Sequence, residues 1–103
     1  MRTQPNARIH GVATVAVVAA GVAFRLSGHE WCRIIAAILL VWIAEGMNTA
    51  LELLADALSP DHHPLIGRAK DVAAGAVLLA AVGATVIGLI TFGPHVAARA
   101  PAG

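Results

Sequence analysis

The chain is poor in cysteine, aromatic residues and charge. Its 103 residues include one cysteine, no tyrosine and only 4 % aromatic residues. The single cysteine, Cys32, excludes an intrachain disulfide and any metal site built from several cysteines, and we expect it to be a small core residue. The net charge at pH 7 is only +1, and the sequence has no basic run with interleaved aromatic residues. We therefore expect no nucleic-acid partner.

Apolar residues dominate the rest of the composition. Hydrophobic residues make up 58 % of the chain and charged residues 13 %, against roughly 25 % charged residues in an ordinary soluble domain. The mean hydropathy is +0.78. A single small soluble core cannot bury so much apolar surface, so the composition indicates a membrane protein.

Three apolar segments predict an all-α integral membrane protein, a three-helix bundle with spans at about residues 9–26, 34–58 and 71–92. We expect one membrane domain over residues 1–95 and a flexible tail over residues 96–103. A polar loop is expected over residues 61–70, and Gly93 and Pro94 are expected to end the third helix. Small residues along the third segment permit close helix packing or oligomerisation. The first segment is also compatible with a secretory signal peptide.

One face of the second segment carries a stripe of four polar side chains: Glu45, Asn48, Glu52 and Asp56. Their spacings of three, four and four residues place them in line, because an α-helix advances about 100° per residue. A carboxylate at or near bilayer depth is costly and therefore suggests a function. These oxygen ligands suit Mg²⁺ or Ca²⁺ rather than zinc, with a general base beside the cation. A solvated helix face or a polar seam between subunits is the alternative.

Lys70 and Asp71 are expected to begin the third helix and to face this stripe across a helix hairpin. An ammonium group beside a carboxylate-bound Mg²⁺ suits phosphate groups, because phosphoryl transfer depends mostly on positioning and charge stabilisation. The sequence contains no Walker-type glycine loop. A pair of charged side chains at the membrane interface is the alternative.

Basic residues are divided almost evenly between the two ends of the predicted bundle. Arg2, Arg8, Arg68 and Lys70 lie on one side, and Arg25, Arg33 and Arg99 on the other. This small excess weakly favours a cytoplasmic N-terminus and a cytoplasmic 61–70 loop. The stripe and the loop would then share the side of the membrane that contains nucleotides.

Two stretches carry a resemblance to a known family. E-G-M-N-T-A-L-E begins at Glu45, and S-P-D-H-H-P-L-I-G-R-A-K-D ends at Asp71. Together they resemble the signature of the prokaryotic diacylglycerol kinase family, which includes the undecaprenol kinases of Gram-positive bacteria. The resemblance runs from about Asn6, in N-A-R-I-H, to Phe92.

The resemblance implies a homotrimeric enzyme of the bacterial inner (cytoplasmic) membrane, with its active site facing the cytoplasm. Such an enzyme transfers the γ-phosphoryl group of ATP, with Mg²⁺ as cofactor, to a lipid alcohol, here diacylglycerol or undecaprenol. By motif position, Glu45 would be the general base and Glu52 a Mg²⁺ ligand. The remaining positions implied to bind ATP are Asn48, Lys70 and Asp71 around the phosphates, and Asp61, His63 and Gly67 around the nucleoside. Trp42, one turn before Glu45, is a candidate for lining the lipid groove, with an ordinary packing role as the alternative.

The chain departs from the family pattern near its N-terminus. Gln4 stands where the family usually carries a glutamate that is a second Mg²⁺ ligand, and an amide oxygen binds Mg²⁺ more weakly than a carboxylate. Only residues 1–3 precede this point, where the family has an amphipathic surface helix, so we expect that helix to be short or missing. Either the true start lies upstream of Met1, or the chain is a shortened member with weakened activity.

Two other functions stay open on the sequence alone. The first is a non-catalytic family member that acts as a membrane interaction module, which Gln4 and the short N-terminus favour. The second is a small proton or ion transporter that uses Glu45 as its carrier group. The G-R-A-K-D stretch has no evident purpose in a transporter.

Overall fold

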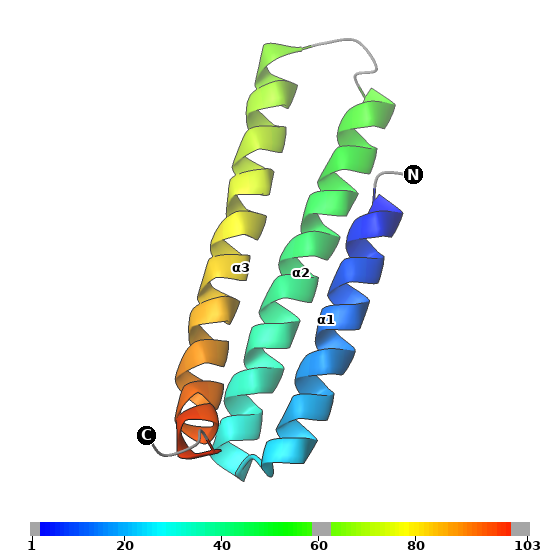
Figure 1. Ribbon diagram of the computed structural model, residues 1–103. Coiled ribbons are helices and arrows are strands. Elements are labelled where there is room, and N and C mark those ends of the chain that lie inside the picture. Colours follow the sequence, from blue (N-terminus) through cyan, green and yellow to red (C-terminus); the bar gives the residue numbers. More distant parts are fainter. Residues whose placement is uncertain (1–2, 59–62, 100–103) are drawn as a thin grey trace.

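The computed structural model describes residues 3–58 and 63–99, with side chains from residue 8 onward. These residues form three helices, α1 (Thr3–Phe24), α2 (Gly28–Leu58) and α3 (Pro64–Arg99). The helices run alternately up and down, so the start of α1 lies toward the same end of the molecule as the end of α2 and the start of α3 (Figure 1). The all-α fold expected from the three apolar segments is confirmed.

The molecule is elongated, with principal extents of 59 × 26 × 19 Å. Helices α2 and α3 form a long antiparallel hairpin that makes most of the contacts between helices, whereas α1 contacts α2 much less. The fully buried side chains are few and are shared between the helices, with Ile34 of α2 and Thr91 of α3 the largest. The α2–α3 hairpin is therefore the main packing unit, and α1 packs against it through fewer contacts.

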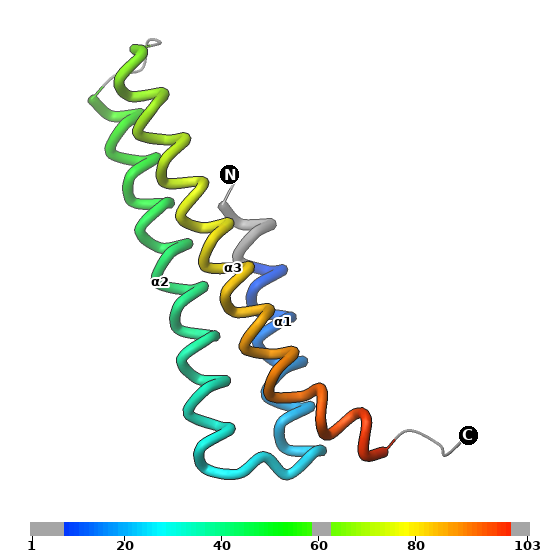
Figure 2. Tube along the Cα trace, turned by 90° about the vertical axis from the view of Figure 1, so that its left-hand side faces the viewer, coloured from blue at the N-terminus to red at the C-terminus, as the bar shows by residue number. Residues whose placement is uncertain are grey.

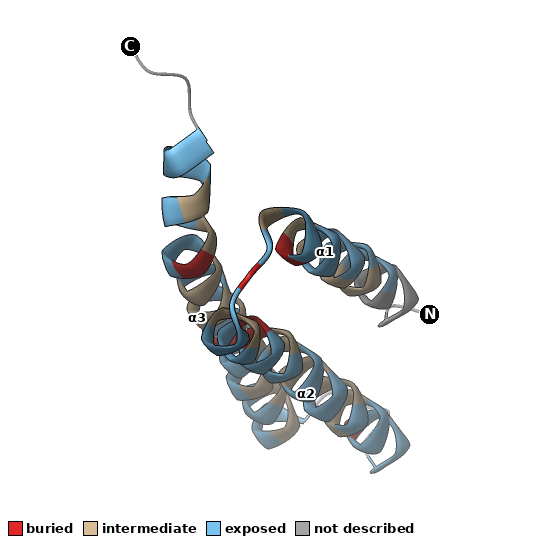
Figure 3. Ribbon diagram, turned by 90° about the horizontal axis from the view of Figure 1, so that it is seen from below, coloured by how far each residue is buried: buried red, intermediate tan, exposed pale blue. Residues whose placement is uncertain are grey.

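Most apolar side chains point outward rather than into a core. Large residues such as Val72, Leu79 and Met47 are 73 %, 74 % and 69 % exposed, and Figure 3 shows exposed positions along every helix. An apolar surface of this extent favours lipid over water as its surroundings. Helices α2 and α3 are long and apolar enough to cross a membrane, whereas the described apolar part of α1, Arg8–Phe24, is shorter than both. Cys32, expected in the core, is exposed, because its position on α2 lies outside the helix contacts.

The turn between α1 and α2 is defined by backbone hydrogen bonds. The Leu26 amide donates to the Gly21 carbonyl at 3.1 Å and the Arg25 amide to the Val22 carbonyl at 3.2 Å. This is the Schellman arrangement, in which one residue after the helix adopts a left-handed conformation. Arg25 takes that position, with a φ of 56°. The chain thereby reverses within three residues.

Helix α2 begins with a reciprocal cap. The Glu30 amide donates to Ser27 Oγ at 3.2 Å, and the Ser27 amide donates to Glu30 Oε1 at 2.9 Å. This S-x-x-E capping box satisfies two backbone donors that would otherwise have no partner at the start of the helix. It fixes where α2 begins relative to α1.

Helix α3 starts earlier than the sequence predicts. It begins at Pro64 rather than near Asp71, so most of the expected 61–70 loop is helical. Proline is favoured in the first turn, where its missing N–H costs nothing. His63 caps the helix, because its Nδ1 accepts a hydrogen bond from the Leu65 amide at 3.1 Å and its carbonyl accepts one from the Gly67 amide at 2.9 Å.

Helix α3 also ends later than the sequence predicts. It continues through Gly93 and Pro94 to Arg99, so residues 96–99 of the expected flexible tail are helical. A proline inside a helix removes one hydrogen bond and bends it, and Figure 2 shows α3 bending toward its C-terminal end. Three contacts hold the bent segment. His95 pairs with Glu30 at 2.7 Å, the His95 ring lies with its centroid 5.7 Å from that of Phe24, and the Arg99 guanidinium lies 4.7 Å from the centre of the Phe24 ring.

Candidate active site

The polar stripe of α2 runs from a mostly buried position to an exposed one. The Glu45 side chain is only 13 % exposed, whereas that of Asp56 is 57 % exposed. Asn48 and Glu52, between them, are half-buried. A helix of 31 residues is about 46 Å long and exceeds a hydrocarbon core of roughly 30 Å, so one end of the stripe can lie deep and the other at the membrane surface.

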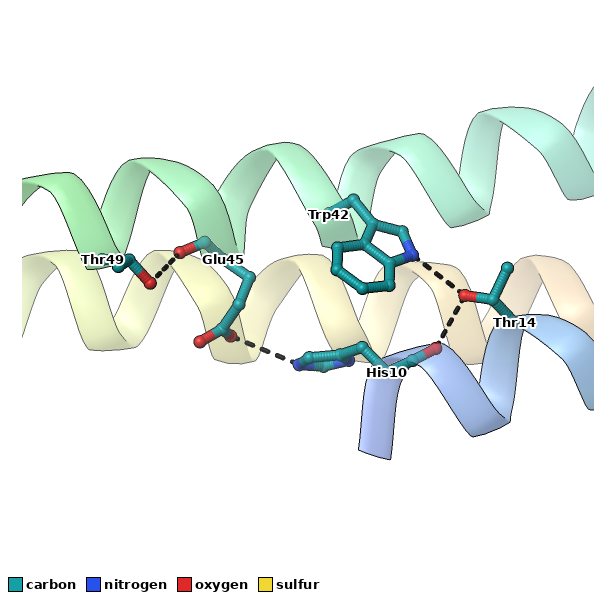
Figure 4. Close-up of polar contacts among 5 residues, drawn as sticks. All are labelled: His10, Thr14, Trp42, Glu45 and Thr49. Atoms are coloured by element: carbon teal, nitrogen blue, oxygen red, sulfur yellow. Dashed lines mark hydrogen bonds and ion pairs between the residues drawn. The ribbon is translucent and has the colours of Figure 1, made fainter. Parts of the chain in front are cut away.

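Glu45 is paired with a histidine of α1. His10 Nε2 lies 3.3 Å from Glu45 Oε2, and the two side chains point toward each other across the α1–α2 contact (Figure 4). The Glu45 backbone carbonyl accepts a hydrogen bond from Thr49 Oγ1 at 2.9 Å within the same helix. The sequence pattern predicts no role for His10, although it lies in the N-A-R-I-H stretch that carries part of the family resemblance.

Trp42 lies one turn before Glu45 and contacts the same part of α1. Its indole N–H donates to Thr14 Oγ1 at 2.9 Å, and Thr14 Oγ1 donates to the His10 carbonyl at 2.7 Å. The rings of Trp42 and His10 meet edge to face, with centroids 5.9 Å apart. Trp42 therefore packs against α1 as well as bordering the cavity described next.

An apolar cavity of about 300 Å³ lies between the three helices next to this group. His10, Thr14 and Trp42 are among its lining residues, and most of the others are aliphatic. Small residues of α3, Ala81, Ala84 and Gly88, line it as well. Their short side chains leave space open between α3 and α1. A cavity of this kind suits an apolar ligand whose polar group lies near His10 and Trp42.

The stripe also contains a buried polar atom without a partner. Asn48 Oδ1 is buried and accepts no hydrogen bond within the described part of the chain. A buried acceptor of this kind normally has a partner. Its position therefore suits a ligand that donates a hydrogen bond to Oδ1 or a cation that Oδ1 coordinates. Among the described residues no group of three or more His, Cys, Asp or Glu side chains could hold a metal by itself. Mg²⁺ usually takes only one or two carboxylates and completes its shell with water and phosphate oxygens. The half-buried Glu52 carboxylate and Asn48 amide oxygen are of the donor type that this cation uses.

Lys70 of α3 reaches the exposed end of the stripe. Its Nζ donates to Asp56 Oδ1 at 2.9 Å, which confirms the expectation that Lys70 faces the stripe across a helix hairpin. Asp71 is exposed. Gly67 lies in the first turn of α3 and His63 directly precedes that helix, so both are at the same end of the hairpin as Lys70. Gln4 lies in the first turns of α1, but its side chain is outside the described part of the structure, as is the whole of Asp61.

Comparison with known proteins assigns the chain to a family. A family model described as prokaryotic diacylglycerol kinase matches residues 1–92. The chain belongs to the prokaryotic diacylglycerol kinase family. Within this family, it is 42 % identical to an undecaprenol kinase of Bacillus subtilis over 93 residues, which cover 90 % of the chain and 76 % of that protein.

Two further relatives are named diacylglycerol kinases. A diacylglycerol kinase of Synechocystis is 42 % identical over 84 % of the chain and 50 % of its own length. A diacylglycerol kinase of Escherichia coli is 32 % identical over 85 % of the chain and 72 % of its own length. Together with the apolar outer surface of α2 and α3, these relatives identify the chain as a membrane-bound lipid kinase.

Proposed function

We propose that the chain transfers the γ-phosphoryl group of MgATP to the hydroxyl group of a membrane lipid alcohol, with Glu45 as the general base. The observation that carries this proposal is the position of Glu45. It is the less exposed of the two stripe carboxylates that contact a nitrogen of another helix, and its partner His10 lines the apolar cavity. A base must lie where the lipid hydroxyl and the nucleotide phosphates can both reach it, and this junction of cavity and stripe provides such a place.

In the proposed reaction, a Glu45 carboxylate oxygen takes the proton of the lipid hydroxyl. The hydroxyl oxygen then forms a bond to the γ-phosphorus while the bond from that phosphorus to the bridging oxygen of ADP breaks. Glu52 would hold the Mg²⁺ that accompanies ATP, which when bound neutralises phosphate charge. Gln4 would add an uncharged and weaker oxygen ligand.

The nucleotide would bind along the exposed part of the stripe. Asn48, with its unpartnered oxygen, and the charged pair Lys70 and Asp71 are proposed to line the phosphate site. The Lys70 ammonium already donates to a carboxylate oxygen, that of Asp56, and a phosphate oxygen offers it the same kind of charged acceptor. Asp61, His63 and Gly67 would contact the nucleoside.

The acceptor lipid is proposed to be undecaprenol or diacylglycerol, the two lipids after which the relatives are named. Its apolar part would occupy the cavity, which Trp42 borders. We further propose a homotrimer in the bacterial inner membrane, with the stripe toward the cytoplasm, where ATP is found. The extensive exposed apolar surface of the single chain leaves ample area both for lipid and for further copies.

The test is phosphate transfer from labelled ATP in mixed micelles with Mg²⁺, with each lipid offered separately. We expect transfer to at least one lipid, and a loss of about 10²- to 10⁴-fold in rate for Glu45→Gln with nucleotide binding kept. Glu30→Gln is the matched control, because Glu30 also pairs with a histidine but at the other end of the bundle. Near-full activity of Glu45→Gln would refute the assignment of the base, and no transfer to either lipid from folded protein would refute the kinase proposal.

A further inference from the structure

The contact between α1 and α2 at the site is built from two pairs of side chains. His10 and Thr14 are one turn apart on α1, and Trp42 and Glu45 are one turn apart on α2. His10 contacts both residues of the α2 pair, Glu45 through Nε2 and Trp42 through the ring. Since α1 contacts α2 much less than α3 does, these four side chains are a large part of what fixes α1 against α2 at this depth.

The chemistry of the pair determines which group donates. Glu45 must be ionised to act as the proposed base, and an ionised carboxylate only accepts hydrogen bonds, so in that state His10 Nε2 carries the hydrogen that points at Glu45 Oε2. The other carboxylate oxygen, Oε1, has no hydrogen-bond partner within the described residues. One oxygen of the proposed base is therefore held, and the other is available to a substrate hydroxyl.

The imidazole is itself held in place. Thr14 donates to the His10 backbone carbonyl and accepts from the Trp42 indole, so a chain of two hydrogen bonds links α2 back to the backbone of His10. The edge-to-face contact with Trp42 restrains the ring plane. The His10 side chain is 22 % exposed, so solvent competes little for its nitrogen.

We propose that His10 is a positioning residue, whose Nε2–H fixes the Glu45 carboxylate so that Oε1 faces the acceptor hydroxyl, with Thr14 and Trp42 as its brace. This inference rests on the proposed function of Glu45. Holding a base at the correct angle matters because a displacement of about 1 Å at a reacting group costs roughly 100-fold in rate.

The experiment compares kcat and KM for His10→Leu and His10→Gln. Leucine removes the donor, and we expect kcat to fall about 10- to 100-fold while KM for MgATP stays within about twofold. Glutamine keeps an N–H at similar reach and should recover most of kcat. The matched control is His95→Leu, which removes the same kind of pair at the far end of the bundle and should leave kcat within about twofold.

A double variant tests whether His10 acts through Glu45. If it does, His10→Leu in a Glu45→Gln background causes no further loss, because the carboxylate it orients is gone. An additional loss equal to that in the wild-type background overturns the proposal. So does a His10→Gln variant no better than His10→Leu.

Thr14→Val keeps the test decisive if His10→Leu does not fold. It retains the imidazole but removes the hydroxyl that links Trp42 to the His10 backbone, and we expect kcat to fall about three- to tenfold. Unchanged kcat in this variant would refute the proposal that Thr14 and Trp42 hold His10 in place. The two proposals can be refuted separately. A fully active Glu45→Gln variant would refute the role of Glu45 as the base. An inactive Glu45→Gln variant together with a fully active His10→Leu variant would refute only the role of His10.

Discussion

Two histidine–carboxylate pairs of the same chemical type occur in different settings. Glu30 pairs with His95 at 2.7 Å, and its other oxygen accepts from the Ser27 amide, so both oxygens have structural partners. Glu45 pairs with His10 through one oxygen and lies beside the apolar cavity. The pair at Glu30 joins the ends of helices, whereas the pair at Glu45 leaves Oε1 without a hydrogen-bond partner among the described residues. The two pairs therefore differ in their surroundings and not in their residue types.

The Lys70 ammonium is expected to contribute binding energy for the nucleotide phosphates. Lys70→Met keeps the side-chain stem and removes the charge, and we expect MgATP to bind about 10- to 150-fold more weakly, because a hydrogen bond to a charged group is worth roughly 1.5–3 kcal/mol. Calorimetric titration of the protein in micelles measures the affinity. Arg68→Met is the control, since Arg68 is exposed in the same part of α3. An equal loss in that variant would show a general effect of charge instead of a contact by Lys70.

The sequence is informative about residues that share one helix. The spacing from Glu45 to Asp56 predicts the stripe, and the prediction that Lys70 faces it is confirmed by its hydrogen bond to Asp56. His10 and Thr14 escape sequence reasoning because α1 is apolar nearly all round, so its pattern does not reveal which face turns toward α2. That rotation depends on packing between helices. The roles of Glu52, Gln4 and Asp61 remain predictions.

At the scale of the helix, the close approach of α1 to α2 depends on Gly21. A Cβ atom at this position would lie 2.6 Å from the Trp31 ring and 3.2 Å from a Leu26 methyl group. A Cβ atom at Gly11, in the same helix, would have nothing within 4 Å. Gly21→Ala should therefore be about 1–3 kcal/mol less stable than Gly11→Ala, since both gain the same helix propensity and only the first forces the packing to shift.

Thermal unfolding in detergent micelles, followed by circular dichroism, measures this difference. Gly11→Ala should match or exceed the wild type in midpoint temperature, because alanine favours a helix by about 1 kcal/mol over glycine. Equal midpoints for the two variants would mean that Trp31 moves aside without cost, and that the turn does not depend on a glycine.

The helix boundaries show where local sequence signals fail. The sequence predicts that Pro64 and Gly67 lie in a loop, but His63 caps the helix and Pro64 occupies its favourable first turn. Pro94 is expected to end α3, but contacts of His95 and Arg99 with the α1–α2 region stabilise the helix beyond it. Long-range contacts of this kind cannot be deduced from nearby residues.

At the scale of the whole molecule, composition is sufficient to predict a helical membrane protein. The expectation of three spans is met in length by α2 and α3, whereas the described apolar part of α1 is shorter. The arrangement separates two polar ends. One carries the stripe and the start of α3, and the other carries the α1–α2 turn with Arg25, Arg33 and Arg99 (Figure 1). The proposed chemistry requires the first end to face ATP.

The single cysteine provides a direct test of this orientation. Cys32 is exposed near the start of α2, at the end opposite the stripe. If the stripe faces the cytoplasm, a membrane-impermeant maleimide added to intact spheroplasts should label Cys32 from outside. In a Cys32→Ser chain with Leu65→Cys, a position that is 64 % exposed at the start of α3, labelling should require permeabilised membranes.

The reversed labelling pattern would place the stripe away from ATP and contradict the kinase orientation. A membrane-permeant maleimide, which should label both cysteines in intact spheroplasts, controls for a thiol that is simply unreactive. Basic residues divide four to three between the two ends, so their bias is a weak determinant of the orientation. The requirement for nucleotide is the stronger argument, because a lipid kinase whose phosphate site faced outward would have no ATP to use. Labelling from the predicted side therefore tests the proposed reaction independently of any activity measurement.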